Sequence, residues 1–152
     1  MLKPFQQYCS LPCKQGSLDA VWTVEPWVTR LLKDGDGKIF YEQKDAVTTV
    51  LVTCNKALKK HKDIIKKFVQ AHIELTEWIK KNPQEAQKLA NAELEALTGR
   101  KLADEIIKDA WNRIIFTSEI NKKSLQQFMD YAHTCGFIRR KMDISKIFLD
   151  NL

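Results

Sequence analysis

Cysteine, glycine and proline are all scarce in this chain. Its 152 residues include 5 glycines, 4 prolines and 4 cysteines, and they contain no low-complexity segment. Cys9 and Cys13 do not have a usual zinc-binding spacing, and the four cysteines are too unevenly spaced to indicate a disulfide framework. His133 and Cys135 could donate two metal ligands, but no complete ligand set accompanies them. We therefore expect neither a bound metal nor another cofactor.

Long apolar runs are also missing. No run approaches the roughly 18 residues that a membrane-spanning helix needs. Residues 1–8 lack the apolar region of a secretory signal peptide, so the chain, taken literally, is expected to be cytoplasmic. The hydrophobic fraction of 44% and charged fraction of 29% are typical of a soluble domain with its own core.

Basic residues outnumber acidic ones by 25 to 19, which gives a formal net charge of +6. This balance admits a nucleic-acid or anionic-lipid partner. The lysines, however, are scattered along helical segments and interleaved with Glu and Asp, with few aromatic residues between them. Such charge patterns are more often solvated helix faces than binding surfaces, and this is the interpretation we prefer.

Strand-like segments are confined to the first third of the chain. Residues 18–24, 38–41 and 47–54 are short and apolar, and the last is dense in β-branched residues, so we predict three strands. Between the first two, Pro26 predicts a helix start because proline is favoured at the first helical position. That helix should cover residues 26–32 and end at the glycine-rich turn 34–37.

Helical periodicity replaces this pattern after Asn55. Apolar residues recurring every three or four positions predict four helices between about residues 59 and 136, with no strand among them. Pro83 should begin the second of them, after an Asn82 cap with Glu85 as its reciprocal partner, and Gly99 should end it. The residues expected to face inward are Ile64, Ile65, Phe68, His72, Leu75, Ile79, Ala86, Leu89, Ala90, Leu94, Leu97, Leu102, Ile106, Ile107, Ala110, Trp111, Ile114, Leu125, Phe128, Met129 and Ala132.

Three stretches, in order, resemble a known family. Residues 16–27, GSLDAVWTVEPW, resemble the pattern G-x-(I/V/L)-D-A followed by (E/D)-P. Residues 52–61, VTCNKALKKH, look like a return strand that leads into a helix. Residues 136–146, GFIRRKMDISK, resemble the closing pattern G-(L/F)-I-x-(K/R)-x-(V/M)-D-(I/V). Together they resemble the C-terminal part of solute-binding proteins of ABC transporters of the sulfonate, taurine and nitrate type.

The resemblance implies an α/β fold, namely a fragment of the type II periplasmic binding protein fold. Its C-terminal part would be mostly helical, with a few strands before residue 55. Residues 16–46 would be a remnant of the second lobe, and residues 47–152 the return strand and helical part of the first lobe. Residues 1–15 match nothing in the family, and a truncated or frame-disrupted gene would explain such a start. A half-protein of this kind should expose an apolar patch near Trp22, Val50, Val52 or Phe68.

The same resemblance implies a function. The chain would be the substrate-binding component of an ABC importer, would bind a small anionic solute such as a sulfonate, taurine or nitrate, and would deliver it to a membrane permease. The family works in the periplasm or anchored to the membrane, and we expect no nucleic-acid partner. No nucleophile motif is present, so we expect no enzymatic activity.

The predicted ligand-binding residues are Trp22, Thr23 and Glu25. A strand end followed by a helix start offers unpaired N–H groups and a positive dipole end, which suit an anion. Glu25 could accept from an ammonium group or merely cap the helix, and Trp22 and Trp27 could line a pocket or belong to the core. Val24 stands where sulfonate binders often carry an aromatic residue, which weakens an alkanesulfonate assignment.

One alternative belongs to a different class. If the chain folds independently of this ancestry, it would be a small basic helical interaction module, with nucleic acid as its candidate partner. Salt-dependent retention on DNA would favour that alternative.

Overall fold

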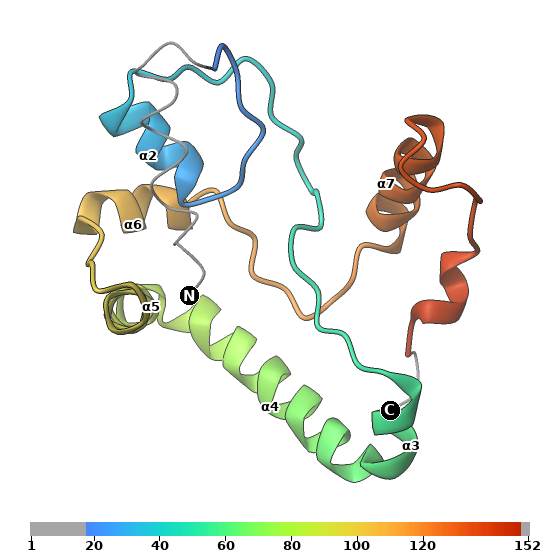
Figure 1. Ribbon diagram of the computed structural model, residues 1–152. Helices are drawn as coiled ribbons and strands as arrows, with labels where there is room; N and C mark the ends of the chain where they lie inside the picture. The colour runs from blue at the N-terminus through green and yellow to red at the C-terminus, as the bar shows by residue number, and fades with distance from the viewer. Residues whose placement is uncertain (1–17, 150–152) are drawn as a thin grey trace. The chain divides into compact units, whose positions relative to one another are not determined.

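A computed structural model describes residues 18–149, which form helices joined by extended segments (Figure 1). The elements are α2 (Trp27–Asp34), α3 (Asn55–Lys60), α4 (Lys62–Lys81), α5 (Pro83–Thr98), α6 (Asp104–Trp111), α7 (Lys122–Thr134) and the 3-10 helix η2 (Ile144–Ile147). The four helices predicted between residues 59 and 136 are confirmed as α4 to α7, and the helix predicted at 26–32 is confirmed as α2. Among the described residues, no helix is both long and apolar enough to cross a membrane.

The predicted α/β fold is wrong, because residues 18–149 contain no β-strand. Residues 18–24, 38–41 and 47–54 lack regular secondary structure, and no backbone hydrogen bond joins any of these segments to another. Composition favours an extended backbone there, but a strand is stabilised by pairing with a neighbouring strand. The three segments have no such neighbour within the described part of the chain, so their β-propensity is not realised.

Two compact units make up the chain. Over the described residues, the first comprises 18–42 and 79–116, and the second comprises 43–78 and 117–149. The predicted assignment of residues 16–46 and 47–152 to two lobes concerns the parent fold and stays a prediction. Residues 1–15, which the resemblance left without a counterpart in the family, lie outside the described range.

The first unit has its core where α2 and α5 pack against α6 (Figure 1). Leu31 of α2, Ala86 of α5, and Ile106, Ile107 and Ala110 of α6 are all buried there. The α6 residues were among those predicted to face inward, and their helical spacing places them on one side. Burial of a Leu or Ile side chain contributes about 1.5–3 kcal/mol, so Leu31, Ile106 and Ile107 each stabilise this unit substantially.

The connection from α5 to α6 is set by two residues. Gly99 ends α5 with a left-handed φ of 71°, as its position in the sequence predicted. Asn91, which is 2% exposed, accepts from the Leu102 N–H and donates to the Leu102 carbonyl. At the start of α5, Pro83 occupies the first turn, as predicted. The predicted reciprocal cap between Asn82 and Glu85 is wrong, because the Asn82 side chain makes no capping hydrogen bond to the helix start.

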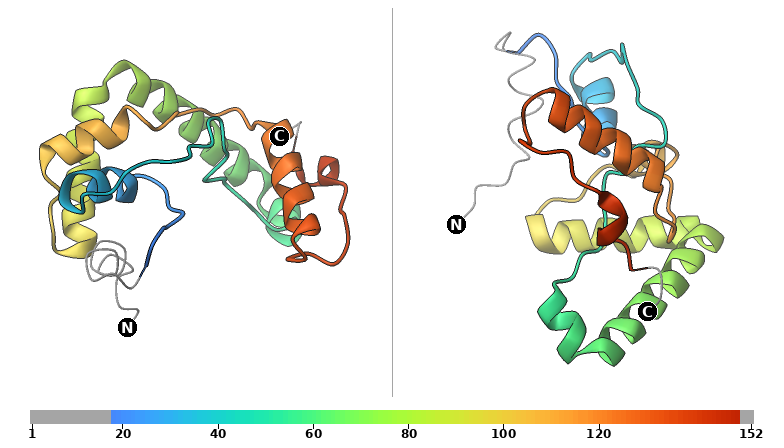
Figure 2. Two further views of the ribbon diagram at one scale, coloured as in Figure 1. Left: turned by 90° about the horizontal axis from the view of Figure 1, so that it is seen from above. Right: turned by 90° about the vertical axis from the view of Figure 1, so that its right-hand side faces the viewer.

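The second unit contains α3, most of α4, α7 and η2 (Figure 2). Few of its side chains are buried. Met129 of α7 and Ile144 of η2 are buried, but Ile64, Phe68 and Leu75 of α4 are 66%, 58% and 53% exposed. The prediction that these three face inward is therefore wrong. An amphipathic face is buried only where another element covers it, and no described element of this unit covers α4 there.

Several other inward-facing predictions fail for the same reason. Leu89 and Leu97 of α5 are 55% and 81% exposed, and Phe128 of α7 is 71% exposed. The four residues expected near an apolar patch, Trp22, Val50, Val52 and Phe68, are indeed all exposed. Whether a single continuous patch joins any of them stays a prediction.

Candidate functional site

The turn before α2 holds the predicted site. The Trp27 N–H donates to the Val24 carbonyl at 3.0 Å, which closes a turn around Glu25 and Pro26. The Glu25 carboxylate then folds back onto the helix, and its Oε2 accepts from the Thr29 N–H at 3.1 Å. A carboxylate at a helix start is favourable because it satisfies an unpaired N–H group and meets the positive end of the helix dipole. Glu25 therefore caps α2, as one of the two interpretations of its role predicted.

The second oxygen of Glu25 is also occupied. Its Oε1 accepts from Nε of Arg113 at 2.8 Å, while Nη2 of Arg113 lies 3.4 Å from Oε1 of Glu42. The side chains of Glu25 and Arg113 are only 9% and 28% exposed, whereas that of Glu42 is 48% exposed. One guanidinium thus serves two carboxylates, so the cluster carries one formal positive charge and two formal negative charges.

Two aromatic side chains from the same stretches face each other. The ring centroids of Trp22 and Tyr41 lie 5.9 Å apart with planes tilted by 31°, an arrangement that aromatic pairs favour. Trp22 is 71% exposed and Tyr41 is 64% exposed, so Trp22 is not a core residue. Both belong to segments that also carry a carboxylate of the charge cluster, since Tyr41 directly precedes Glu42.

The two threonines near Glu25 differ in environment. Thr23, a predicted ligand residue, is half-buried. Thr29 is 2% exposed, and its hydroxyl is buried without a hydrogen-bond partner among the described residues. A buried hydroxyl without a partner is costly, since it has lost its bonds to water. Trp27, the other aromatic residue of the turn, is half-buried and lies 5.5 Å from the Arg30 guanidinium, so it packs against its own helix.

A second group of ion pairs joins α2 to α6, the helix that precedes Arg113. Nζ of Lys33 lies 2.7 Å from Asp109 and 3.5 Å from Glu105, both on α6. The hydrogen bond to Asp109 is the largest of the effects that raise the pKa of Lys33 above its usual value. Arg113 lies two residues after the end of α6, and its backbone N–H donates to the Ala110 carbonyl. These contacts, together with the shared core, position Arg113 opposite Glu25.

The second unit has a shallow pocket of about 320 Å³ between the start of α7 and η2. Lys122, Lys123 and Phe148 line it together with Asp143 and Ser145. Hydrogen bonds from the Ser145 hydroxyl and N–H hold the pKa of Asp143 below its usual value, which keeps that carboxylate ionised. The pocket combines positive and negative groups, and it contains none of the residues predicted to bind ligand.

Metal-binding clusters are not found among the described residues, where no three His, Cys, Asp or Glu side chains are grouped to hold an ion. Cys54 and Cys135 are free and exposed, and the Cys54 sulfur accepts from the Ala57 N–H at the start of α3.

Sequence reasoning found one member of the charge cluster and missed the other two. Glu25 stood out because it precedes a helix-starting proline. Arg113 lies 88 residues further along and follows α6 without a motif, so nothing local pointed to it. Glu42 likewise sits in a segment interpreted only as the end of a strand. Ligand binding by Trp22, Thr23 and Glu25 stays a prediction.

Comparison with known proteins identifies the family of the chain. The model of the NMT1-like family matches residues 10–94, more than half of the chain. The chain belongs to the NMT1-like family, one of a group of binding proteins that includes the sulfonate, nitrate and taurine types. The matched range includes the stretches 16–27 and 52–61, whereas the resemblance of residues 136–146 stays a prediction.

Membership of this family points to a solute-binding protein of an ABC importer. No curated protein and no solved structure matches the chain.

Proposed function

We propose that this protein binds a small anionic or zwitterionic solute of the sulfonate, taurine or nitrate kind for an ABC importer. The observation that carries the proposal is the family match over residues 10–94, which includes the turn at Glu25 and Pro26. The solute would then be passed to a membrane permease, and the protein would work in the periplasm or anchored at the membrane surface. It would bind its ligand without chemical change. Family membership leaves the nucleic-acid alternative without support.

The charge cluster suggests which member of this ligand class fits best. Arg113 offers N–H donors that suit a sulfonate or carboxylate group, but two carboxylates already balance its charge. A purely anionic ligand would meet net negative charge there. A ligand that also carries an ammonium group would be attracted to the carboxylates, of which Glu42 is the more accessible. We therefore favour a taurine-like zwitterion over nitrate or a simple alkanesulfonate.

The aromatic pair fits the same ligand. An ammonium group is attracted to the face of Trp or Tyr, at about 0.5–1 kcal/mol for an exposed site. Trp22 and Tyr41 are joined by ring contact and lie in the segments that lead to Glu25 and Glu42. Because both rings are largely exposed, water competes for the ligand. We expect the chain to bind taurine weakly, with a dissociation constant on the order of 1 mM, about −4 kcal/mol.

The test is a titration of the 152-residue chain with taurine, ethanesulfonate and nitrate, followed by NMR because the expected affinity is low. Taurine should bind most tightly, and Glu42→Gln should weaken taurine binding several-fold. Glu93→Gln is the matched control, because Glu93 is an exposed carboxylate of α5 without an ion-pair partner among the described residues.

Three results would contradict the proposal. Ethanesulfonate or nitrate could bind as tightly as taurine, which would refute the zwitterion preference but retain the anion class. Glu93→Gln could weaken binding as much as Glu42→Gln, which would place the ligand elsewhere. Binding of none of the three solutes would refute the ligand class itself.

A further inference from the structure

One side of α4 carries an apolar line that nothing in its unit covers. Ile64, Phe68, Ala71 and Leu75 are spaced by four, three and four residues, which keeps them on one side of an α-helix. All four are exposed, and the three large ones are 53–66% exposed. We call these four residues the α4 stripe. The alternation of four and three is the spacing by which two helices pack along a shared seam.

Opposite charges border one edge of this stripe. Lys67 directly precedes Phe68, and Glu74 directly precedes Leu75, so the two charges lie along the same edge about two turns apart. Both are exposed, and Lys67 has no ion-pair partner among the described residues. The Gln70 amide, one turn before Glu74 on the same helix, donates to Oε1 of that carboxylate at 2.9 Å.

We propose that the α4 stripe docks antiparallel against the α4 stripe of a second copy of this chain. A two-fold axis near the middle of the stripe places Phe68 of one copy opposite Ala71 of the other, and Ile64 opposite Leu75. The large Phe68 ring thus faces the small Ala71 side chain, and Ile64 faces Leu75, which is of similar size. The same rotation brings Lys67 of each copy beside Glu74 of its partner, so the interface contains two equivalent ion pairs. Self-complementarity of this kind is what an isologous interface requires.

The positions of Lys67 and Glu74 also favour antiparallel over parallel pairing of the two α4 helices. In a parallel pair, residues on this edge face residues five positions further along the partner, so Lys67 would meet His72 and Glu74 would meet Ile79. Neither contact pairs opposite charges. A lipid surface would not need Glu74 at the border of the stripe, since an acidic residue weakens attraction to anionic lipid. The charges therefore favour an antiparallel second copy.

Affinity should be modest. A helix of 20 residues is about 30 Å long, and the four-layer stripe occupies only part of it. Such a contact is smaller than the interfaces of roughly 1,200–2,000 Å² that stable complexes bury. We expect a dimer that dissociates in the range of micromolar to hundreds of micromolar concentration.

Sedimentation equilibrium over a concentration series of the full chain tests the proposal. Lys67→Glu alone and Glu74→Lys alone place like charges opposite each other, so each should weaken dimerisation by about tenfold. The double variant Lys67→Glu with Glu74→Lys reverses both charges and should restore the original dissociation constant to within about threefold. Circular dichroism of each variant checks that the helices are retained.

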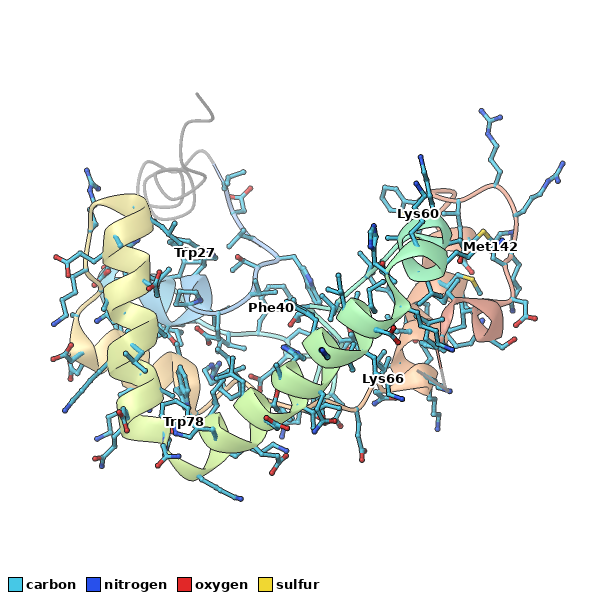
Figure 3. All side chains as sticks on the ribbon, turned by 90° about the horizontal axis from the view of Figure 1, so that it is seen from below. Trp27, Phe40, Lys60, Lys66, Trp78 and Met142 are labelled. Carbon is cyan, nitrogen blue, oxygen red and sulfur yellow. The ribbon has the colours of Figure 1, made fainter. Side chains whose placement is uncertain are left out.

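Lys66→Glu is the matched control. Lys66 lies on α4 one residue before Lys67 and projects from the side opposite the stripe, as the helical spacing requires (Lys66 is labelled in Figure 3). It changes the net charge as much as Lys67→Glu does, and it should leave the dissociation constant unchanged.

Several outcomes would overturn the proposal. The chain could stay monomeric throughout the series, or Lys66→Glu could weaken the dimer as much as Lys67→Glu. If the double variant does not regain the original dissociation constant, the dimer forms through another face or with the helices parallel. Binding of a monomeric chain to vesicles containing phosphatidylserine, abolished by Leu75→Glu, would show that the stripe docks on lipid instead.

Discussion

The guanidinium of Arg113 donates to the carboxylate of Glu25 at 2.8 Å, although 88 residues separate the two along the chain. The same carboxylate accepts from the Thr29 N–H at the start of α2. The Glu25 side chain therefore joins the start of α2, where we predict ligand binding, to the segment that follows α6. The Glu25 side chain is only 9% exposed, so its charge depends on Arg113 for compensation.

Replacement of Arg113 should destabilise the first unit. Arg113→Gln leaves the poorly solvated Glu25 carboxylate without its counter-charge, at an expected cost of about 1–3 kcal/mol in the free energy of unfolding. Glu25→Gln should cost a similar amount because it weakens both the pair and the cap. Urea denaturation of the two single variants and the double variant gives the coupling. The double variant should cost less than the sum of the singles, and strict additivity would show that the contact is not energetically coupled.

Removal of the buried Thr29 hydroxyl, unlike the replacement of Arg113, should not lower the stability of the first unit. Thr29→Val keeps the shape and removes a polar group without a described partner, so stability should stay equal or rise by up to about 1 kcal/mol. Thr76→Val is the matched control in α4, since the buried Thr76 hydroxyl donates to the His72 carbonyl at 2.8 Å. Loss of that bond should make the control the less stable of the two in thermal unfolding. A destabilised Thr29→Val would mean that the hydroxyl has a bonding partner.

Asn91 should be among the most sensitive positions in the first unit. It is 2% exposed and bonds both the N–H and the carbonyl of Leu102, at 3.0 and 2.9 Å. Asn91→Ala leaves both backbone groups without their partner, at an expected cost of about 2–4 kcal/mol. Gln84→Ala, on an exposed position of α5, should change stability by less than about 0.5 kcal/mol. Equal unfolding midpoints for the two variants would contradict this role of Asn91.

Two aspartates of the second unit should titrate below the usual value of 3.8 for different reasons. A hydrogen bond from Lys141 is the main cause that lowers the pKa of Asp130, whereas bonds from Ser145 lower that of Asp143. Both carboxylates thus favour folding above their unfolded pKa. That contribution falls away as the pH drops through the lower folded pKa.

Carboxyl NMR titration separates these causes. Lys141→Met should raise the pKa of Asp130 and leave that of Asp143 in place, while Ser145→Ala should do the reverse. A variant that shifts both pKa values together would show that net charge, rather than the specific hydrogen bonds, controls these groups.

Local signals in the sequence predicted the helices but not what covers them. The spacing of apolar residues predicted α4 to α7, and Pro83 and Gly99 predicted the ends of α5, because both depend on neighbours within a few residues. Burial of Phe68 and Leu75 depends on a partner surface, which periodicity within one helix does not describe. The prediction of three strands was wrong for the same reason, because it too depends on a partner. A β-branched composition favours an extended backbone, but a strand also requires a second segment to pair with.

The candidate site was predictable only where its residues are local. Glu25 could be recognised because it precedes Pro26 at a helix start, and the structure confirms its capping contact. Arg113 and Glu42 join it through the packing of α2 on α6, which no motif in either segment encodes. Charge compensation of a buried carboxylate is a tertiary property, so its partner becomes visible only in the fold.

The most direct test of the account is to locate the taurine-binding site on the chain. In NMR titrations with ¹⁵N-labelled protein, we predict that the resonances of the Trp22 indole N–H, the Thr29 amide and the Arg113 Nε–H shift together with one dissociation constant. Shifts confined to Lys123 and Ser145, which line the pocket beside η2, would place the ligand in the other unit and contradict the account. An absence of saturable shifts anywhere in the chain would contradict it equally.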